Sequence, residues 1–182
     1  MEAEYALDVR YTYFPLHPET PLEGRSLADL FTGREEMWAS MRSRLVALMA
    51  EEGLEYGDRT DTYNSRLAQE LAVWGDEEGV TDALHDALYR AYFVDARNLA
   101  ETDVLVDVAT SVGLDGKRAR AVVEDRTNRE TVDGHWRRAL EMGVRGVPTF
   151  VSEGLDVVGA QPYEILEDLV TRAGATRRGA EG

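Results

Sequence analysis

The chain has 182 residues, of which 43% are hydrophobic, and this length is enough for one globular unit with or without a sizeable insertion. Its 35 acidic residues outnumber its 20 basic residues, which gives a formal net charge of −15. Such a surface repels phosphate groups, so the composition argues against nucleic-acid binding and against docking to anionic membranes.

The chain contains no cysteine, which excludes disulfide bonds and thiolate nucleophiles within these residues. It opens on the acidic stretch Met1–Glu4, which does not resemble a signal peptide, and no run of about 18 apolar residues follows. We therefore expect a cytoplasmic protein without a membrane span.

The first predicted element is an edge strand near residues 7–13. Four apolar or aromatic residues alternate there with polar ones, and a period of two indicates a half-buried strand; they are Leu7, Val9, Tyr11 and Tyr13. Prolines then break the pattern, and residues 14–21, which include His17, are predicted to form an extended loop.

The middle of the chain is predicted to be helical. Thr32 and Glu35 have the spacing of a capping box, and the helix that they begin is expected to end at Gly53. Its apolar stripe favours a packed core over a ligand pocket, and consists of Met37, Trp38, Met41, Leu45, Leu48 and Met49. Further helices are predicted at residues 64–75 (with Asn64 as N-cap), 81–96, 103–112, 115–126 and 128–142.

A loop between Gly143 and a short apolar strand at Thr149–Val151 contains Val147-Pro148. An X-Pro bond adopts the cis form at a cost of only about 0.5–1 kcal/mol. A cis bond would turn the backbone of Val147 outward to pair with an extended ligand. From these residues alone, an ordinary trans proline that ends a loop is equally consistent with the sequence.

The last elements are a hairpin and a helix. Thr149–Val151 and Leu155–Val158 flank Ser152-Glu153-Gly154, where glycine supplies a positive φ. Pro162 suits the first turn of the final helix, whose predicted buried face consists of Tyr163, Leu166, Leu169 and Val170.

The segment from Gly143 to Val151, followed by Val157-Val158-Gly159-Ala160-Gln161-Pro162, resembles the C-terminal part of the DsbA family. It is most similar to the FrnE-like branch, which is related to 2-hydroxychromene-2-carboxylate isomerases and kappa-class glutathione transferases. The resemblance implies an α/β thioredoxin-like sheet with an inserted all-helical domain and a cis-proline loop that faces the redox centre.

The resemblance begins near Asp8, so the family's first strand and its active-site helix with Cys-x-x-Cys have no counterpart here. It therefore implies a sheet that is incomplete at the N-terminus. Residues 1–30 and 143–173 are assigned to the thioredoxin-like part, residues 31–142 to the helical insertion with its linking helix, and residues 174–182 to a disordered tail.

The resemblance also implies a set of cleft residues, although it assigns no catalytic residue. They are Val147 and Pro148 in the loop, Gly159 and Gln161 after the hairpin, Asn64 at a helix start, and His17 in the first loop. The other serines and histidines form no nucleophile or metal motif, so no metal site is expected.

Three functions stay open on this basis. The chain is a redox-inactive homologue that binds a peptide or a small thiol, a truncated thiol–disulfide oxidoreductase, or a glutathione-dependent isomerase or transferase. No cofactor is expected unless glutathione is one. Because the missing strand leaves two strands without a neighbour, we also expect a homodimer, with exchanged strands as one form.

Overall fold

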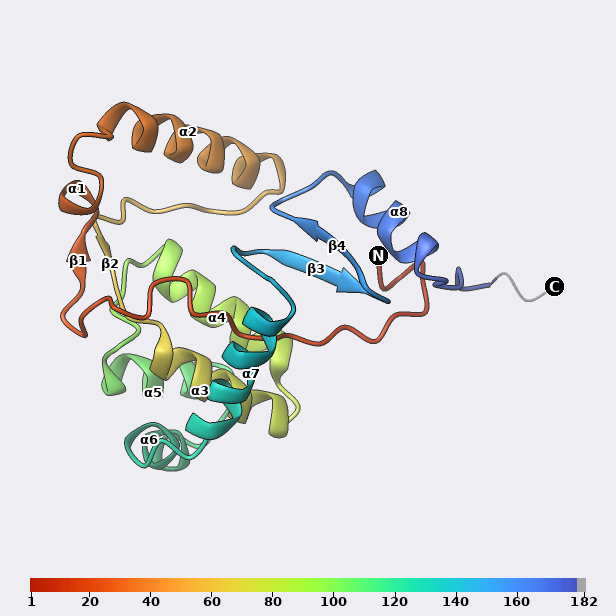
Figure 1. The fold of residues 1–182 in the computed structure, drawn as a ribbon. Coiled ribbons are helices and arrows are strands. Elements are labelled where there is room, and N and C mark those ends of the chain that lie inside the picture. Colours follow the sequence, from red (N-terminus) through yellow and green to blue (C-terminus); the bar gives the residue numbers. More distant parts are fainter. Residues whose placement is uncertain (180–182) are drawn as a thin grey trace. The chain divides into compact units, whose positions relative to one another are not determined.

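The computed structural model describes residues 1–179, which divide into two compact units. One unit contains residues 17–133, and the other combines residues 1–16 with residues from 134 onward. Figure 1 labels the elements of both units. The mixed α/β content that the sequence predicts is confirmed, with long helices and short strands.

The unit of residues 17–133 is mainly helical. The predicted helices are confirmed with ends shifted by a few residues: α2 (Glu35–Glu51), α3 (Arg66–Glu77), α4 (Thr81–Phe93), α5 (Thr102–Ser111), α6 (Gly116–Glu124) and the beginning of α7 (Arg129–Glu141). The sequence did not predict α1 (Leu27–Leu30) or the two-residue strands β1 (Arg25–Ser26) and β2 (Asp61–Thr62), which pair antiparallel. Strands of this length are too short to show a period-two pattern.

The core of this unit lies among α3 to α7. Five of its large side chains are exposed by 2% or less, namely Leu71, Leu84, Leu105, Val123 and Val132. Each comes from a different helix, so all five helices contribute a side chain to one core.

Helix α2 differs from the prediction, because it contains no buried residue. Met37, Met41 and Leu48 are exposed by 44%, 53% and 39%. At about 100° per residue the stripe residues lie on one side of the helix, but in the described part of the chain no neighbour buries any of them fully. The predicted packed core of this stripe is therefore wrong.

The capping box predicted for α2 is also wrong. Arg34 occupies the N-cap position, and the Thr32 hydroxyl donates a hydrogen bond to the carbonyl of Ala28 instead of accepting one. The Glu35 carboxylate accepts from the backbone N–H of Gly33 at 2.7 Å. The short helix α1, which the sequence did not predict, satisfies Thr32 from the preceding turn.

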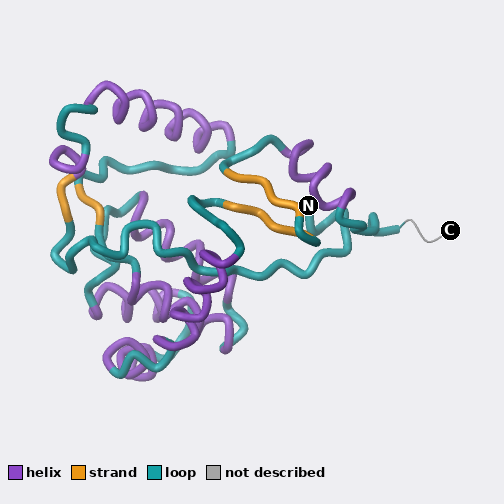
Figure 2. Tube along the Cα trace, in the orientation of Figure 1, coloured by secondary structure: helices purple, strands orange, loops and turns teal. Residues whose placement is uncertain are grey.

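In the other unit, residues 7–14 form no strand, which contradicts the predicted edge strand. Figure 2 draws this segment as loop, and none of the ladders in the described chain includes it. A strand needs a hydrogen-bonded neighbour, and here alternation alone does not supply one. The ring of Tyr13 stacks on His135 at 5.5 Å between centroids.

The C-terminal hairpin and helix are confirmed as β3 (Thr149–Ser152), β4 (Leu155–Val158) and α8 (Tyr163–Arg172). The hairpin loop has two residues, Glu153 and Gly154, with φ of 47° and 78°. Positive φ at both positions is the pattern of a type I′ turn, which suits the twist of two antiparallel strands.

Residues 174–179 are ordered against the N-terminal segment, in contrast to the predicted disorder of residues 174–182; residues 180–182 lie outside the described part. Tyr5 forms a β-bridge with Arg177, and the backbone N–H of Arg178 donates to the carbonyl of Glu4 at 2.7 Å. The Tyr5 hydroxyl also donates to Glu167 of α8 at 2.6 Å. These contacts join residues 4–5 to residues 177–178 and to α8, and the charge pattern of the tail does not predict them.

Candidate functional site

The loop between α7 and β3 places Val147 and Pro148 at the start of the hairpin. Gly143 ends the helix with φ of 78°, and the N–H of Val144 donates back to the carbonyl of Ala139. The Val147–Pro148 peptide bond is cis. Val147 is 51% exposed, so it lies at the surface of this unit.

Pro148 fixes which backbone groups of β3 point outward. Its carbonyl accepts a hydrogen bond from the N–H of Gly159 at 2.8 Å, which makes Pro148 and Gly159 the first pair of the hairpin ladder. Hydrogen-bonded pairs alternate along an antiparallel ladder, and the register pairs Thr149 with Val158 and Val151 with Asp156. Thr149 and Val151 therefore direct their N–H and C=O groups away from β4, toward the open edge of β3.

Gly159 and Gln161 lie at the same end of the hairpin as Pro148. Gly159 has φ of 89°, and a Cβ added to it would lie 3.7 Å from the Gln161 amide nitrogen. That amide donates to the carbonyl of Val158 at 2.8 Å. The structure thus brings together four of the six residues that the sequence predicted for the site.

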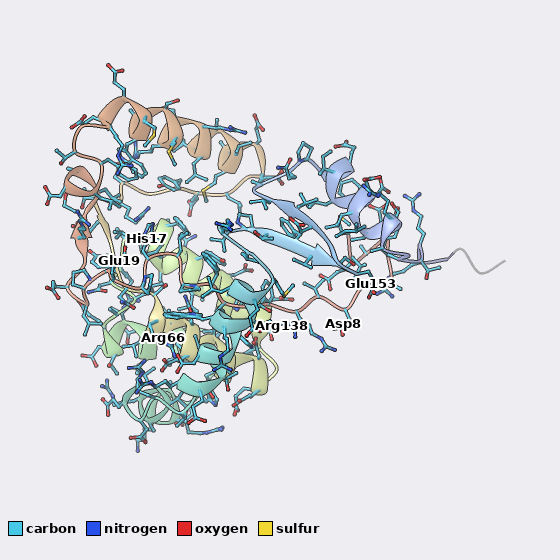
Figure 3. All side chains as sticks on the ribbon, viewed as in Figure 1. Asp8, His17, Glu19, Arg66, Arg138 and Glu153 are labelled. Carbon is cyan, nitrogen blue, oxygen red and sulfur yellow. The ribbon has the colours of Figure 1, made fainter. Side chains whose placement is uncertain are left out.

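Asn64 and His17 belong to the other unit. The Asn64 amide donates to the carbonyls of Thr20 and Pro18 at 2.8 and 3.3 Å, and its oxygen accepts from the N–H of Arg66. This side chain holds residues 18–20 against the start of α3. The predicted N-cap at Asn64 is wrong by one residue, because Ser65 occupies the N-cap position of α3 and makes no side-chain cap hydrogen bond. His17 Nδ1 lies 3.4 Å from Glu19 Oε1 in the same loop (Figure 3).

Sequence reasoning missed a buried charged cluster around Glu70 on α3. Glu70 is fully buried, and its carboxylate accepts from Arg66 at 2.6 Å and from two nitrogens of Arg126 at 2.6 Å. Its backbone carbonyl also accepts from the Asn128 amide at 3.1 Å. The four-residue spacing of Arg66 and Glu70 is typical of an ordinary surface pair, and nothing in the sequence connects either residue with Arg126.

The arginines decide the ionisation of Glu70. Burial alone raises its pKa, but the hydrogen bonds from Arg126 and Arg66 outweigh burial and hold the pKa below its ordinary value. Arg66 itself is paired a second time, with Asp133 at 2.7 Å. Glu70 is therefore a structural anion of the helical unit, and its buried charge leaves no proton for acid–base catalysis.

Within the described residues, no group of three or more His, Asp or Glu side chains is placed to hold a metal ion. The described helices also include none with the length and apolar character needed to cross a membrane. At the start of β3 the site presents outward backbone groups and the exposed side chain of Val147.

A β-hairpin that follows a cis-proline loop and packs on a C-terminal helix, in a chain that also contains a helical unit, defines a thioredoxin-like α/β protein with a helical insertion. The sequence matches the DSBA-like thioredoxin domain over residues 1–171. The chain belongs to this family.

Two solved structures and one sequence relative show how far the similarity extends. A probable DsbA oxidoreductase from Streptomyces coelicolor superimposes with a TM-score of 0.84 at 31% identity, covering 91% of this chain and 75% of that one. The cytosolic disulfide reductase DsbM from Pseudomonas aeruginosa, in a structure with GSH, shares the fold at 23% identity and a TM-score of 0.51, covering 66% and 68% of the two chains. The uncharacterised protein YwbO of Bacillus subtilis is 27% identical over 85 residues, which are 46% of this chain but only 42% of that protein.

Proposed function

We propose that this chain is a redox-inactive member of the DsbA family that binds an extended polypeptide along the open edge of β3. The family supplies a thioredoxin-like fold whose relatives are oxidoreductases. Thiol–disulfide exchange needs one thiolate to attack and another to leave, and these 182 residues contain no cysteine. Without cysteine the chain cannot exchange disulfides, but the residues present still support binding of a polypeptide.

The observation that carries the proposal is the outward direction of the backbone groups of Thr149 and Val151. Each of these residues directs one N–H and one C=O away from β4, and a peptide in extended form pairs with such an edge as an added strand. Val147 and Val151 are exposed by 51% and 42% and offer apolar contact to the side chains of the peptide. Backbone pairing gives affinity with little dependence on sequence, which suits an unfolded polypeptide as ligand.

A proline substitution tests this edge directly. In Val151→Pro the outward N–H is lost, whereas the bonds between β3 and β4 stay, because Val151 does not donate to β4. We expect at least about tenfold weaker binding of reduced and carboxymethylated α-lactalbumin, an unfolded chain without free thiols, measured by fluorescence anisotropy. The matched control is Asp156→Pro, directly opposite on β4, which blocks the other edge of the hairpin.

If both variants bind as the wild type does, or if both lose binding equally while their circular dichroism is unchanged, the β3 edge is not the site. An insulin-reduction assay gives a separate check of the redox half of the proposal. The chain is expected to add nothing to the rate given by dithiothreitol alone.

The second candidate is a glutathione-dependent isomerase or transferase, in which bound thiol supplies the missing sulfur. It is favoured by the DsbM structure, which contains GSH, and by the same open edge, which would suit a tripeptide. Calorimetry with reduced glutathione separates the two functions, since this candidate requires saturable binding and the polypeptide binder does not. A cytoplasmic location fits both candidates.

The homodimer stays a prediction of this proposal. An unpaired edge also pairs with the same edge of a second copy, related by a two-fold axis. We expect multi-angle light scattering to show a mass that rises with concentration toward twice 20.3 kDa, and Val151→Pro to shift the equilibrium toward the monomer. A monomer at all concentrations would contradict the dimer while leaving peptide binding open.

A further inference from the structure

The helical unit contains a pocket of about 510 Å³ between α2, the residues that follow it, and α4. Leu45 and Met49 line it from α2, Leu54 from the connector, and Tyr89 and Phe93 from α4. This volume lies within the range of small-molecule sites. None of these residues belongs to the hairpin site described above.

The wall formed by α4 is aromatic and open. The rings of Tyr89 and Phe93 are stacked with 5.9 Å between centroids and an interplanar angle of 16°. Tyr89 is 62% exposed, which is unusual for a ring that forms the side of a pocket. His85 also contacts Tyr89, edge to face with 6.5 Å between centroids, and the exposed part of the Tyr89 ring offers aromatic surface against which a further planar ring can pack.

The opposite wall is apolar. It consists of Leu45 and Met49 of α2, the helix that has no buried residue of its own. The unbranched side chain of Met49 can adapt its shape to a ligand.

The charges around the pocket favour a cation. Arg90 and Glu55 neutralise each other through a 2.8 Å ion pair. Asp86 also lines the pocket, and among the residues that the structure describes it has no hydrogen bond or ion pair that would neutralise it. The same aromatic cluster already holds a guanidinium, since Arg59 lies 5.6 Å from the centroid of Phe93.

We propose that this pocket binds a small planar aromatic cation, which stacks on Tyr89, places its charge near Asp86 and is covered by Leu45 and Met49 of α2. Aromatic rings attract cations through their negative faces, and a carboxylate at the rim adds to that attraction. The pocket shares no residue with the β3 edge, so a negative result for one of the two proposals does not contradict the other.

A pair of dyes with the same ring system tests the proposal on the intact chain. Rhodamine 6G is a cationic xanthene, and fluorescein is an anionic one. We expect saturable anisotropy changes with rhodamine 6G and affinity for fluorescein that is weaker by about tenfold or more. Tyr89→Ala is expected to weaken rhodamine binding about tenfold, and Asp86→Asn about threefold to fivefold.

The control is Asp82→Asn, which removes an equal charge one helical turn earlier on α4 and outside the pocket. Its affinity is expected to stay within about twofold of the wild type at physiological salt, because a charge one turn farther along α4 attracts the bound cation more weakly through water. Equal losses in Asp82→Asn and Asp86→Asn would show attraction to the net charge alone and overturn the proposal. Absence of saturation, or equal binding of the two dyes, would also overturn it.

The same measurements distinguish two other ligands of the pocket between α2 and α4, namely a second copy of this chain and an unfolded polypeptide. If Tyr89→Ala shifts a concentration-dependent mass in light scattering and leaves dye binding unchanged, the surface contacts a second copy of this chain. If carboxymethylated α-lactalbumin displaces the dye and Tyr89→Ala weakens its binding, the surface holds polypeptide. Either result contradicts a site for aromatic cations.

Discussion

Replacing Glu70 by glutamine is expected to lower the free energy of unfolding at neutral pH by about 3–5 kcal/mol. The change removes a charge that is fully buried between Arg66 and Arg126, while the volume of the side chain stays the same. It turns an amide N–H₂ toward two guanidinium groups that have only donors to offer. Arg126 then remains near the interior without its anion and Arg66 keeps only Asp133, and that loss is larger than the energy of the pair itself.

Chemical denaturation of the wild type and the variant, monitored by tryptophan fluorescence, measures this change. Glu77→Gln is the matched control, because Glu77 lies on the same helix and is exposed. The control is expected to stay within about 0.5 kcal/mol of the wild type. A difference between the two variants below about 1 kcal/mol would mean that water, rather than the arginines, solvates Glu70.

The same pair of proteins gives a pH dependence with a definite sign. Burial opposes the ionisation of Glu70, but the hydrogen bonds from Arg126 and Arg66 outweigh it, so the pKa of the folded group is lowered. An unfolded glutamate titrates at about 4.3, so the contribution of Glu70 is fully present above that pH and is lost as the pH falls through the lower folded pKa. The stability gap between wild type and Glu70→Gln is therefore expected to be constant from neutral pH to about 5 and to narrow below that.

Glu70 also shows what the sequence could and could not predict. Apolar periodicity placed α3 to α7 within a few residues, because it reports the local match between a helix face and a core. The ion cluster joins Glu70 and Arg126, which are 56 positions apart, and a local sequence pattern cannot predict a contact over that separation. The hairpin end of the candidate site was predicted from the resemblance of residues 143–151 and 157–162 to the DsbA family, and these residues lie close together in the sequence.

The wrong predictions for residues 7–14 and for α2 have a common cause. The first segment has the alternation of a strand, and α2 has the apolar content of a core helix. Alternation shows that a segment could pair as a strand, and apolar content shows that a helix could be buried. Neither pattern shows whether the structure provides the neighbouring strand or the covering element. In this chain the described residues supply no ladder for the first segment, and they leave α2 without a fully buried residue.

The contact between Gly75 and Leu84 leads to a second large effect. Leu84 is fully buried on α4, and a Cβ added to Gly75 on α3 would overlap the Cδ2 atom of Leu84. Leu84→Ala is expected to cost about 3 kcal/mol, as other buried leucine-to-alanine changes do. Gly75→Ala alone is expected to cost about 1–2 kcal/mol, because the overlap outweighs the better helix propensity of alanine.

When Gly75→Ala and Leu84→Ala are combined, the methyl group added on α3 occupies space that the shortened side chain on α4 has vacated. The two changes are therefore expected to be less destabilising together than the sum of the single effects, with a coupling of about 1 kcal/mol or more. A double-mutant cycle from urea denaturation measures this coupling. Leu105→Ala paired with Gly75→Ala is the control. Leu105 lies on α5, and none of its atoms is among the nearest contacts of a Cβ added at Gly75.

Additive effects in the Gly75 and Leu84 pair would show that α3 and α4 separate to accept the methyl group. In that case the helices would already be separated in Gly75→Ala, so shortening Leu84 would relieve no overlap. The cost of Gly75→Ala would then come from the lost close contact between the two helices and not from Leu84.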